Sequence, residues 1–162
     1  MDEFASRQYP VQEHMHFQRR MWLVERVGWA ALTAIALLAL TGLFGTGWLS
    51  KATADGKDLS IRYERFQRAT KLAEFSFRFA AGEGERSLHL NTAFQQNYEI
   101  ASIQPQPSRS QAGEDGLTLT FATSPAGGMV SLWAHPRSYG ISEIEARSGS
   151  APPLAFSIIV YP

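Results

Sequence analysis

The feature that most constrains this chain is an uncharged run of 22 residues from Val27 to Trp48. As a helix that rises about 1.5 Å per residue, this run is about 33 Å long, and the hydrocarbon core of a bilayer is about 30 Å thick. The apolar region of a signal peptide is shorter, at about 7–15 residues. The run therefore predicts a transmembrane helix, which we place at residues 27–49.

The flanks of this run carry the residue types that hold a helix at the two membrane surfaces. Trp rings and long basic side chains favour the headgroup layer. The predicted membrane-interface anchors are Arg19, Arg20, Trp22, Arg26, Trp29, Trp48 and Lys51. Arg19, Arg20 and Arg26 lie close before the run, whereas Lys51 and Lys57 follow it. The positive-inside rule then favours a cytoplasmic N-terminus and an extracytoplasmic C-terminal domain.

A cleaved export signal is the alternative to a permanent anchor. Residues 19–23, Arg-Arg-Met-Trp-Leu, are similar to a twin-arginine signal, and residues 52–54, Ala-Thr-Ala, have the small-x-small form of a cleavage site. The length of the apolar run favours an anchor that stays. An export signal that is retained as an anchor satisfies both patterns, so the role of the Arg19-Arg20 pair stays open.

Small residues within the run suggest a surface for helix packing. Helices associate in lipid through small side chains that allow close approach. The helix-packing candidates are Ala30, Ala34, Gly42 and Gly45. The run contains no ionisable residue, so it provides no proton or ion path by itself.

Short polar segments flank the predicted span. Residues 1–26 form a tail in which Tyr9-Pro10 interrupts any early helix. After that break, Val11, Met15 and Trp22 fall near one helical face, which predicts an interfacial helix leading into the span. Residues 50–58 are polar and are interpreted as a linker.

From Leu59 onward the apolar period changes to two, which is typical of strands with one buried face. Phe75, Phe77 and Phe79 share one such face and are expected in a core rather than in a ligand cleft. Turn-rich pieces separate the segments, and no helical pattern intervenes. Residues 59–162 therefore predict an antiparallel, immunoglobulin-like β-sandwich of about eight strands, with an open barrel as the alternative fold. The expected strands are residues 59–63, 75–79, 88–90, 98–100, 117–121, 129–135, 139–144 and 156–161.

The longest irregular piece predicted in this domain is residues 104–116. Long loops in compact domains often bind partners. The residues proposed for a partner loop are Gln104, Pro105, Pro107 and Arg109.

The composition argues against several classes of chemistry. The chain has 15 basic and 15 acidic residues, so no basic block favours nucleic acid binding. It has no cysteine, which removes disulfides and thiolate chemistry. His89 and His135 stand apart from any recognisable catalytic or metal-binding motif. We therefore expect no catalytic residues, no cofactor and no metal site.

Several segments together resemble a group of small, uncharacterised bacterial single-pass membrane proteins. The resemblance rests on residues 25–29, 42–45, 49–54, 63–66 and 160–162. Members of this group have a short N-terminal tail, one span and a β-rich end. The resemblance implies a bacterial inner membrane protein with a periplasmic domain, and it supplies no functional residues.

These observations favour a membrane-anchored, non-catalytic accessory subunit. Its span and its sandwich would dock on a larger integral membrane protein or on further copies of the chain, with membrane lipid around the span. The alternative hypothesis is a tethered ligand-binding or sensing module with an open aromatic cleft between its sheets.

Overall fold

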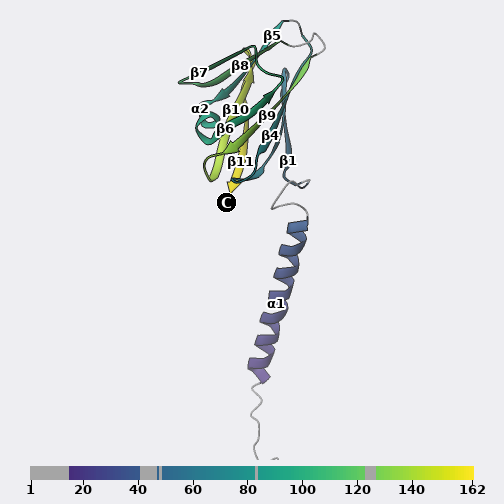
Figure 1. The fold of residues 1–162 in the computed structure, drawn as a ribbon. Coiled ribbons are helices and arrows are strands. Elements are labelled where there is room, and N and C mark those ends of the chain that lie inside the picture. The colour runs from purple at the N-terminus through teal and green to yellow at the C-terminus, as the bar shows by residue number, and fades with distance from the viewer. Residues whose placement is uncertain (1–14, 41–46, 48, 83, 123–126) are drawn as a thin grey trace, which may run out of the picture. The chain divides into compact units, whose positions relative to one another are not determined.

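The computed structural model describes residues 15–40, 47, 49–82, 84–122 and 127–162 (Figure 1). By its internal contacts the chain divides into two units, residues 1–40 and residues 41–162. The helices are α1 (Met15–Leu40) and α2 (Thr92–Asn97). The strands are β1 (Lys51–Asp55), β2 (Leu59–Glu64), β3 (Phe66–Arg68), β4 (Ala73–Phe79), β5 (Glu85–Asn91), β6 (Tyr98–Gln104), β7 (Arg109–Gly113), β8 (Gly116–Ala122), β9 (Gly128–Pro136), β10 (Gly140–Ser148) and β11 (Leu154–Tyr161).

Helix α1 carries apolar side chains on all sides. Within it, Phe17–Leu40 forms a stretch of 24 residues that is long and apolar enough to cross a membrane, and none of it is buried within the protein. The exposed apolar side chains of such a helix are favourable in the hydrocarbon core of a bilayer and unfavourable in water. The predicted interfacial helix and the first part of the predicted span form one continuous helix that begins at Met15. Residues 41–46 and 48 of the predicted span lie outside the described residues.

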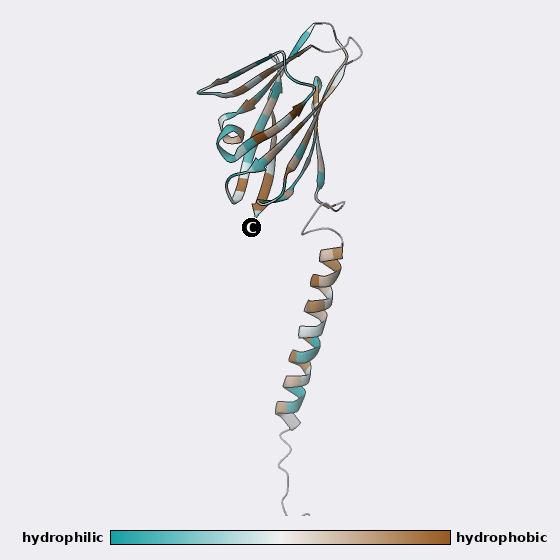
Figure 2. Cartoon of the chain, in the orientation of Figure 1, coloured by the Kyte–Doolittle hydropathy of each residue, from teal (hydrophilic) through white to brown (hydrophobic). Residues whose placement is uncertain are grey.

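The second unit is a β-sandwich, as the alternating pattern predicted. One sheet, here called sheet A, has the strand order β1-β2-β4-β9-β6. The other, sheet B, has the order β3-β11-β10-β5-β8-β7. Figure 2 shows the reason for the two layers, because hydrophobic and hydrophilic residues alternate along most strands. Each sheet therefore has one apolar face, and the two faces bury each other.

The structure differs from the predicted sandwich in four respects. Eleven strands form among the described residues, since β1, β3 and β7 join the eight expected ones. The predicted linker at residues 50–58 contains β1, which pairs with β2. The short helix α2 interrupts a region predicted to have no helix. β3 pairs in parallel with β11, whereas only antiparallel pairs were expected.

The core lies between the two sheets. Phe75, Phe77 and Phe79 of β4 all face inward and are at most 2% exposed, which confirms the predicted core face. From sheet B, Leu88, Leu90 and residues of β8, β10 and β11 complete this core. Helix α2 contributes Phe94, and Asn91 caps the helix because its side-chain oxygen accepts a hydrogen bond from the Phe94 N–H.

Candidate functional site

The interior of the sandwich is filled by packed aromatic rings at the position where a cleft would be needed for an apolar ligand. The rings of Phe94 and Tyr98 stack with centroids 5.0 Å apart. Phe75 meets Phe94 edge-on at 5.5 Å and meets Tyr98 edge-on at 5.4 Å. These are favourable aromatic geometries. The rings of Phe75, Phe94 and Tyr98 therefore pack on one another and form part of the core.

A buried polar pair joins the two sheets beside these rings. The Tyr98 hydroxyl, on β6, donates a hydrogen bond of 2.9 Å to the Gln67 side-chain oxygen on β3. The Gln67 amide nitrogen donates in turn to the Glu64 carbonyl at 3.0 Å. Burial raises the pKa of Tyr98 well above its ordinary value of 10.0, because the phenolate would lose its hydration. This pair holds the sheets together and is inaccessible to a ligand, since both residues are buried.

A hollow lies on the outer face of sheet A. It has a volume of about 370 Å³, within the range of small-ligand sites. A second hollow of about 240 Å³ shares Thr53, Arg62 and Ser76 with the first. The two hollows are therefore adjacent, and we call them together the outer groove. Its lining residues are Lys51, Thr53, Asp55, Ser60, Arg62, Tyr63, Glu64, Glu74, Ser76, Arg78 and Met129.

Strand register explains why the outer groove is hollow and polar. Thr53 pairs with Arg62, Arg62 with Ser76, and Ser76 with Ser131, so one row across the sheet consists mostly of small hydroxyl side chains. Charged side chains of both signs stand around this row. Such a surface offers hydrogen-bond donors and acceptors to a polar partner. None of the site residues predicted from the sequence except Lys51 lines this groove, and the outward Ser and Thr positions of the alternating strands were the available signal.

The two histidines of the sandwich lie on different sheets. His89 of β5 is half-buried, and its Nδ1 lies 3.0 Å from the Thr118 hydroxyl oxygen. These two atoms form a hydrogen bond in which the tautomer of the ring decides which one donates. His135 of β9 is exposed and pairs in register with Glu99. Within the part of the chain that the structure describes, no three His, Asp or Glu side chains come together as a metal site.

The predicted membrane-interface anchors divide between the two units. Arg19, Arg20, Trp22, Arg26 and Trp29 are exposed on α1. The Arg26 guanidinium lies 4.1 Å from the centre of the Trp22 ring, a cation–π contact. Lys51 begins β1 in the sandwich, and Trp48 lies outside the described residues.

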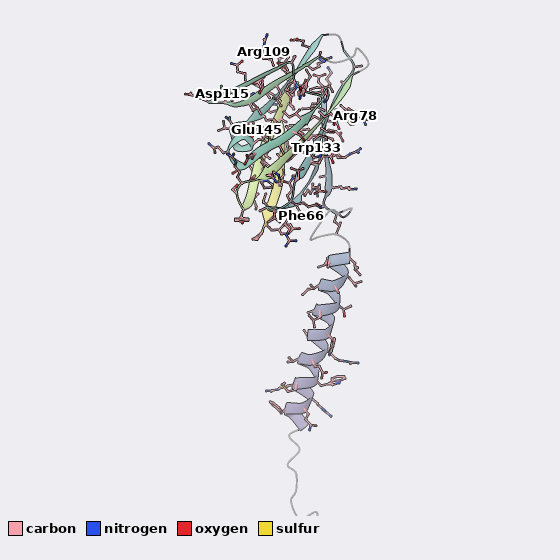
Figure 3. The ribbon with its side chains drawn as sticks, viewed as in Figure 1. Phe66, Arg78, Arg109, Asp115, Trp133 and Glu145 are labelled. Atoms are coloured by element: carbon pink, nitrogen blue, oxygen red, sulfur yellow. The ribbon has the colours of Figure 1, made fainter. Side chains whose placement is uncertain are left out.

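The predicted packing and loop residues are placed as follows. Ala30 and Ala34 lie one helical turn apart on α1, while Gly42 and Gly45 are outside the described residues. Gln104 ends β6 and Arg109 begins β7, so part of the predicted loop at residues 104–116 is a strand. All five residues of β7 are exposed, and this strand forms one edge of sheet B. Figure 3 places Arg109 at the opposite end of the sandwich from Phe66.

Comparisons with known proteins identify similar folds and no family. No protein-family model matches the chain, and no curated protein matches it. Among solved structures, it is similar to a cohesin module from a Clostridium perfringens ATCC13124 family 33 glycoside hydrolase, at 9% identity and a TM-score of 0.47, covering 67% of this chain and 98% of that one. It is also similar to the cupredoxin domain of amoB from Nitrosocaldus yellowstonii, at 17% identity and a TM-score of 0.31, covering 65% of this chain and 57% of that one. At these values the similarity concerns the fold alone.

Proposed function

We propose that this protein is a membrane-anchored, non-catalytic interaction subunit of a larger integral membrane protein complex. The observation that carries this proposal is the pairing of two features in one chain. Phe17–Leu40 is a long apolar stretch with none of its surface buried within the protein. The second unit is a sandwich whose interior is filled by its own side chains. A membrane anchor joined to a packed domain fits a protein that docks on a partner better than it fits an enzyme.

The exposed surfaces of both units support docking. Ala30 and Ala34 present small side chains on one side of α1, where another helix can approach closely. β7 presents unpaired backbone groups at the edge of sheet B, which is a surface that a partner strand can extend. The flanking residues Gln104, Pro105 and Pro107 remain the proposed partner loop.

We further propose that the N-terminal tail is cytoplasmic and that the sandwich lies outside the cytoplasm of a bacterial inner membrane. The support is the cluster of Arg19, Arg20 and Arg26 just before the uncharged run that begins at Val27.

Native co-purification tests the subunit proposal. The C-terminally tagged chain is extracted from its own host in a mild detergent, and co-purifying proteins are quantified by mass spectrometry. We expect one integral membrane protein at a fixed stoichiometry. The Ala30→Leu/Ala34→Leu variant should lose it, and Ala36→Leu, the same change on the opposite side of α1, should retain it. Recovery of the wild-type chain alone, as a monomer or dimer, contradicts the proposal.

A second candidate function, a polar-ligand-binding module, is favoured by the outer groove. Its row of small hydroxyl side chains between charges of both signs could hold a peptide or a glycan. Ser76→Trp would fill the groove from its floor, whereas Ser157→Trp places the same ring on the outer face of sheet B. Peptide and glycan arrays probed with the full chain in nanodiscs test this candidate. A ligand bound equally by both variants contradicts it.

A further inference from the structure

One end of the sandwich is fixed to the chain that arrives from α1. We call it the tethered end and define it as Lys51 with residues 64–72, 137–141 and 159–162. β1 begins and β11 ends at this end (Figure 1). The Arg65 N–H donates to the Ser50 carbonyl at 2.6 Å, and the Ser50 hydroxyl donates to the Phe66 carbonyl at 3.2 Å. Ser50 directly precedes β1 and is fully buried, so this residue is held in place beside Phe66.

Exposed apolar side chains gather at the tethered end. Five large apolar side chains of the described sandwich are exposed, and four of them lie here: Leu72 (42%), Tyr139 (69%), Ile141 (73%) and Ile159 (40%). The fifth, Met129, pairs with Arg78 on sheet A. Apolar side chains this exposed in a cluster mark a surface that meets another apolar phase or a partner.

Strand register places two members of this cluster, Ile141 and Ile159, beside Phe66. Phe66 of β3 pairs with Ile159 of β11, and Ile159 pairs with Ile141 of β10. The three side chains therefore form one row across the outer face of sheet B. The next outward row on β10 and β11 is Glu143 with Ser157, which is polar. The apolar row at the tethered end is thus followed directly by a polar row on the same face of sheet B.

The tethered end is also basic, although the sandwich as a whole is neutral. It carries Lys51, Arg65, Arg68, Lys71 and Arg137 against Glu64, with Glu99 bound to Arg137 at 3.3 Å. Residues 51–162 contain 11 basic and 11 acidic side chains. Positive charge is therefore concentrated at the same end as the exposed apolar side chains. Apolar and aromatic groups surrounded by Lys and Arg suit a surface of anionic lipid.

The length of the connection keeps the tethered end near the bilayer. Ten residues, 41–50, join the end of α1 to β1, and a fully extended chain spans at most about 3.5 Å per residue. Ser50 is thus within about 35 Å of the end of α1 in any arrangement. We propose that the tethered end binds the headgroup region of an anionic phospholipid bilayer. Tyr139, Ile141 and Leu72 enter the interface, while Arg65, Arg68 and Lys71 contact lipid phosphates.

This inference rests on the membrane anchor of the proposed function and not on its protein partner. The absence of cysteine allows a direct test with single-cysteine variants. The full chain is placed in nanodiscs of phosphatidylcholine with phosphatidylglycerol. An environment-sensitive NBD fluorophore is attached at Ile141→Cys or at Tyr139→Cys, and quenching by lipids with spin-labelled headgroups is measured.

We expect NBD at positions 141 and 139 to emit at shorter wavelength and to be quenched. Met129→Cys is the matched control, since it is an exposed apolar position outside the tethered end, and Glu114→Cys is a polar control. Both control labels should stay unquenched. Equal quenching at 141 and 129 overturns the proposal. An unquenched label at 141, together with a disulfide that links two unlabelled Ile141→Cys chains, assigns the surface to a second copy and also overturns it.

Charge variants test the lipid class. Arg68→Gln/Lys71→Gln should reduce quenching at position 141, whereas Arg109→Gln, an exposed basic residue on β7, should leave it unchanged. Quenching that is identical with and without phosphatidylglycerol overturns binding to anionic lipid. If the chain fails to enter nanodiscs, the anchor itself fails and the lipid contact with it. If the chain enters and positions 139 and 141 stay unquenched, the anchor stands and only the lipid contact is overturned.

Discussion

At the scale of single residues, Tyr98 joins the aromatic core to a buried hydrogen bond between the two sheets. Its ring contacts Phe75 and Phe94, and its hydroxyl reaches Gln67 on the other sheet. A buried acceptor that loses its donor costs about 1–3 kcal/mol. Stability at this site therefore depends on one hydroxyl group as well as on ring packing.

Tyr98→Phe should lower the free energy of unfolding by about 1–3 kcal/mol, because the Gln67 oxygen loses its donor while the ring stays. The measurement is urea unfolding of the detergent-solubilised full chain by near-ultraviolet circular dichroism. Tyr98→Phe/Gln67→Leu is the control and should regain part of the loss, since both polar partners are then removed. Unchanged stability of Tyr98→Phe would show that the hydrogen bond contributes nothing.

The same residue predicts a pH dependence. Burial raises the folded-state pKa of Tyr98 above the 10.0 of an unfolded chain. Above about pH 10 the folded state then holds a proton that the unfolded state releases, so stability falls as pH rises, by up to about 1.4 kcal/mol per pH unit. We expect unfolding midpoints of wild type and Tyr98→Phe to converge between about pH 9 and pH 11. Parallel curves would contradict the prediction.

Gly116 occupies a position that only glycine fits. Its φ of 129° lies in a region that side chains disfavour, and a Cβ there would overlap the Leu90 carbonyl oxygen on the paired strand. Gly116→Ala should destabilise the sandwich by more than the strain of about 1–3 kcal/mol alone. Gly140→Ala is the matched control, since its φ is 110° and nothing lies within 4 Å of an added Cβ. Equal losses in the free energy of unfolding of Gly116→Ala and Gly140→Ala, measured by the same urea unfolding, would show that the overlap with the Leu90 carbonyl oxygen does not affect stability.

At the scale of elements, β1 bears on whether the N-terminal helix is removed. The Ala52-Thr53-Ala54 motif lies within β1, where Ala52 is buried and Thr53 pairs with Arg62. Cleavage after Ala54 would detach most of an edge strand from sheet A. We expect the protein recovered from membranes to retain α1 and the Ala52-Thr53-Ala54 motif in one uncleaved chain.

Intact-mass spectrometry checks this prediction. The control is a variant with Arg19→Lys and Arg20→Lys, which keeps the charge but removes the twin-arginine pair. Its mass should differ from wild type by the substitutions only. A fragment that begins at Asp55 in the wild type, and is absent from the variant, would instead establish a cleaved twin-arginine signal.

At the scale of the whole molecule, the proposed orientation in the membrane rests on Arg19, Arg20 and Arg26, which precede the uncharged run that begins at Val27. We expect Glu114→Cys, between β7 and β8, to react with a membrane-impermeant maleimide in intact bacterial spheroplasts. Ser6→Cys, in the N-terminal tail, should react only after lysis. The wild-type chain has no cysteine and provides the blank. The reverse pattern of labelling would place the sandwich in the cytoplasm.

Local pattern was sufficient for the elements with strong periodicity. The uncharged run predicted an apolar helix, and the alternation in β4 predicted its buried Phe face, because both patterns depend only on residues close in sequence. β1, β3 and β7 were missed for the opposite reason. β7 reads Arg-Ser-Gln-Ala-Gly and has every residue exposed, so its pairing with β8 provides the only signal.

The sequence by itself determined the two-part organisation, an apolar helix followed by a β-sandwich, since burial of apolar faces is encoded in spacing. Tertiary structure alone decided which side chains meet. The outer groove needs three adjacent strands in one register, and the apolar row of Phe66, Ile159 and Ile141 needs a parallel pair of strands that are far apart in the chain. Contacts between distant segments leave no local period, so only the folded sheets bring these surfaces together.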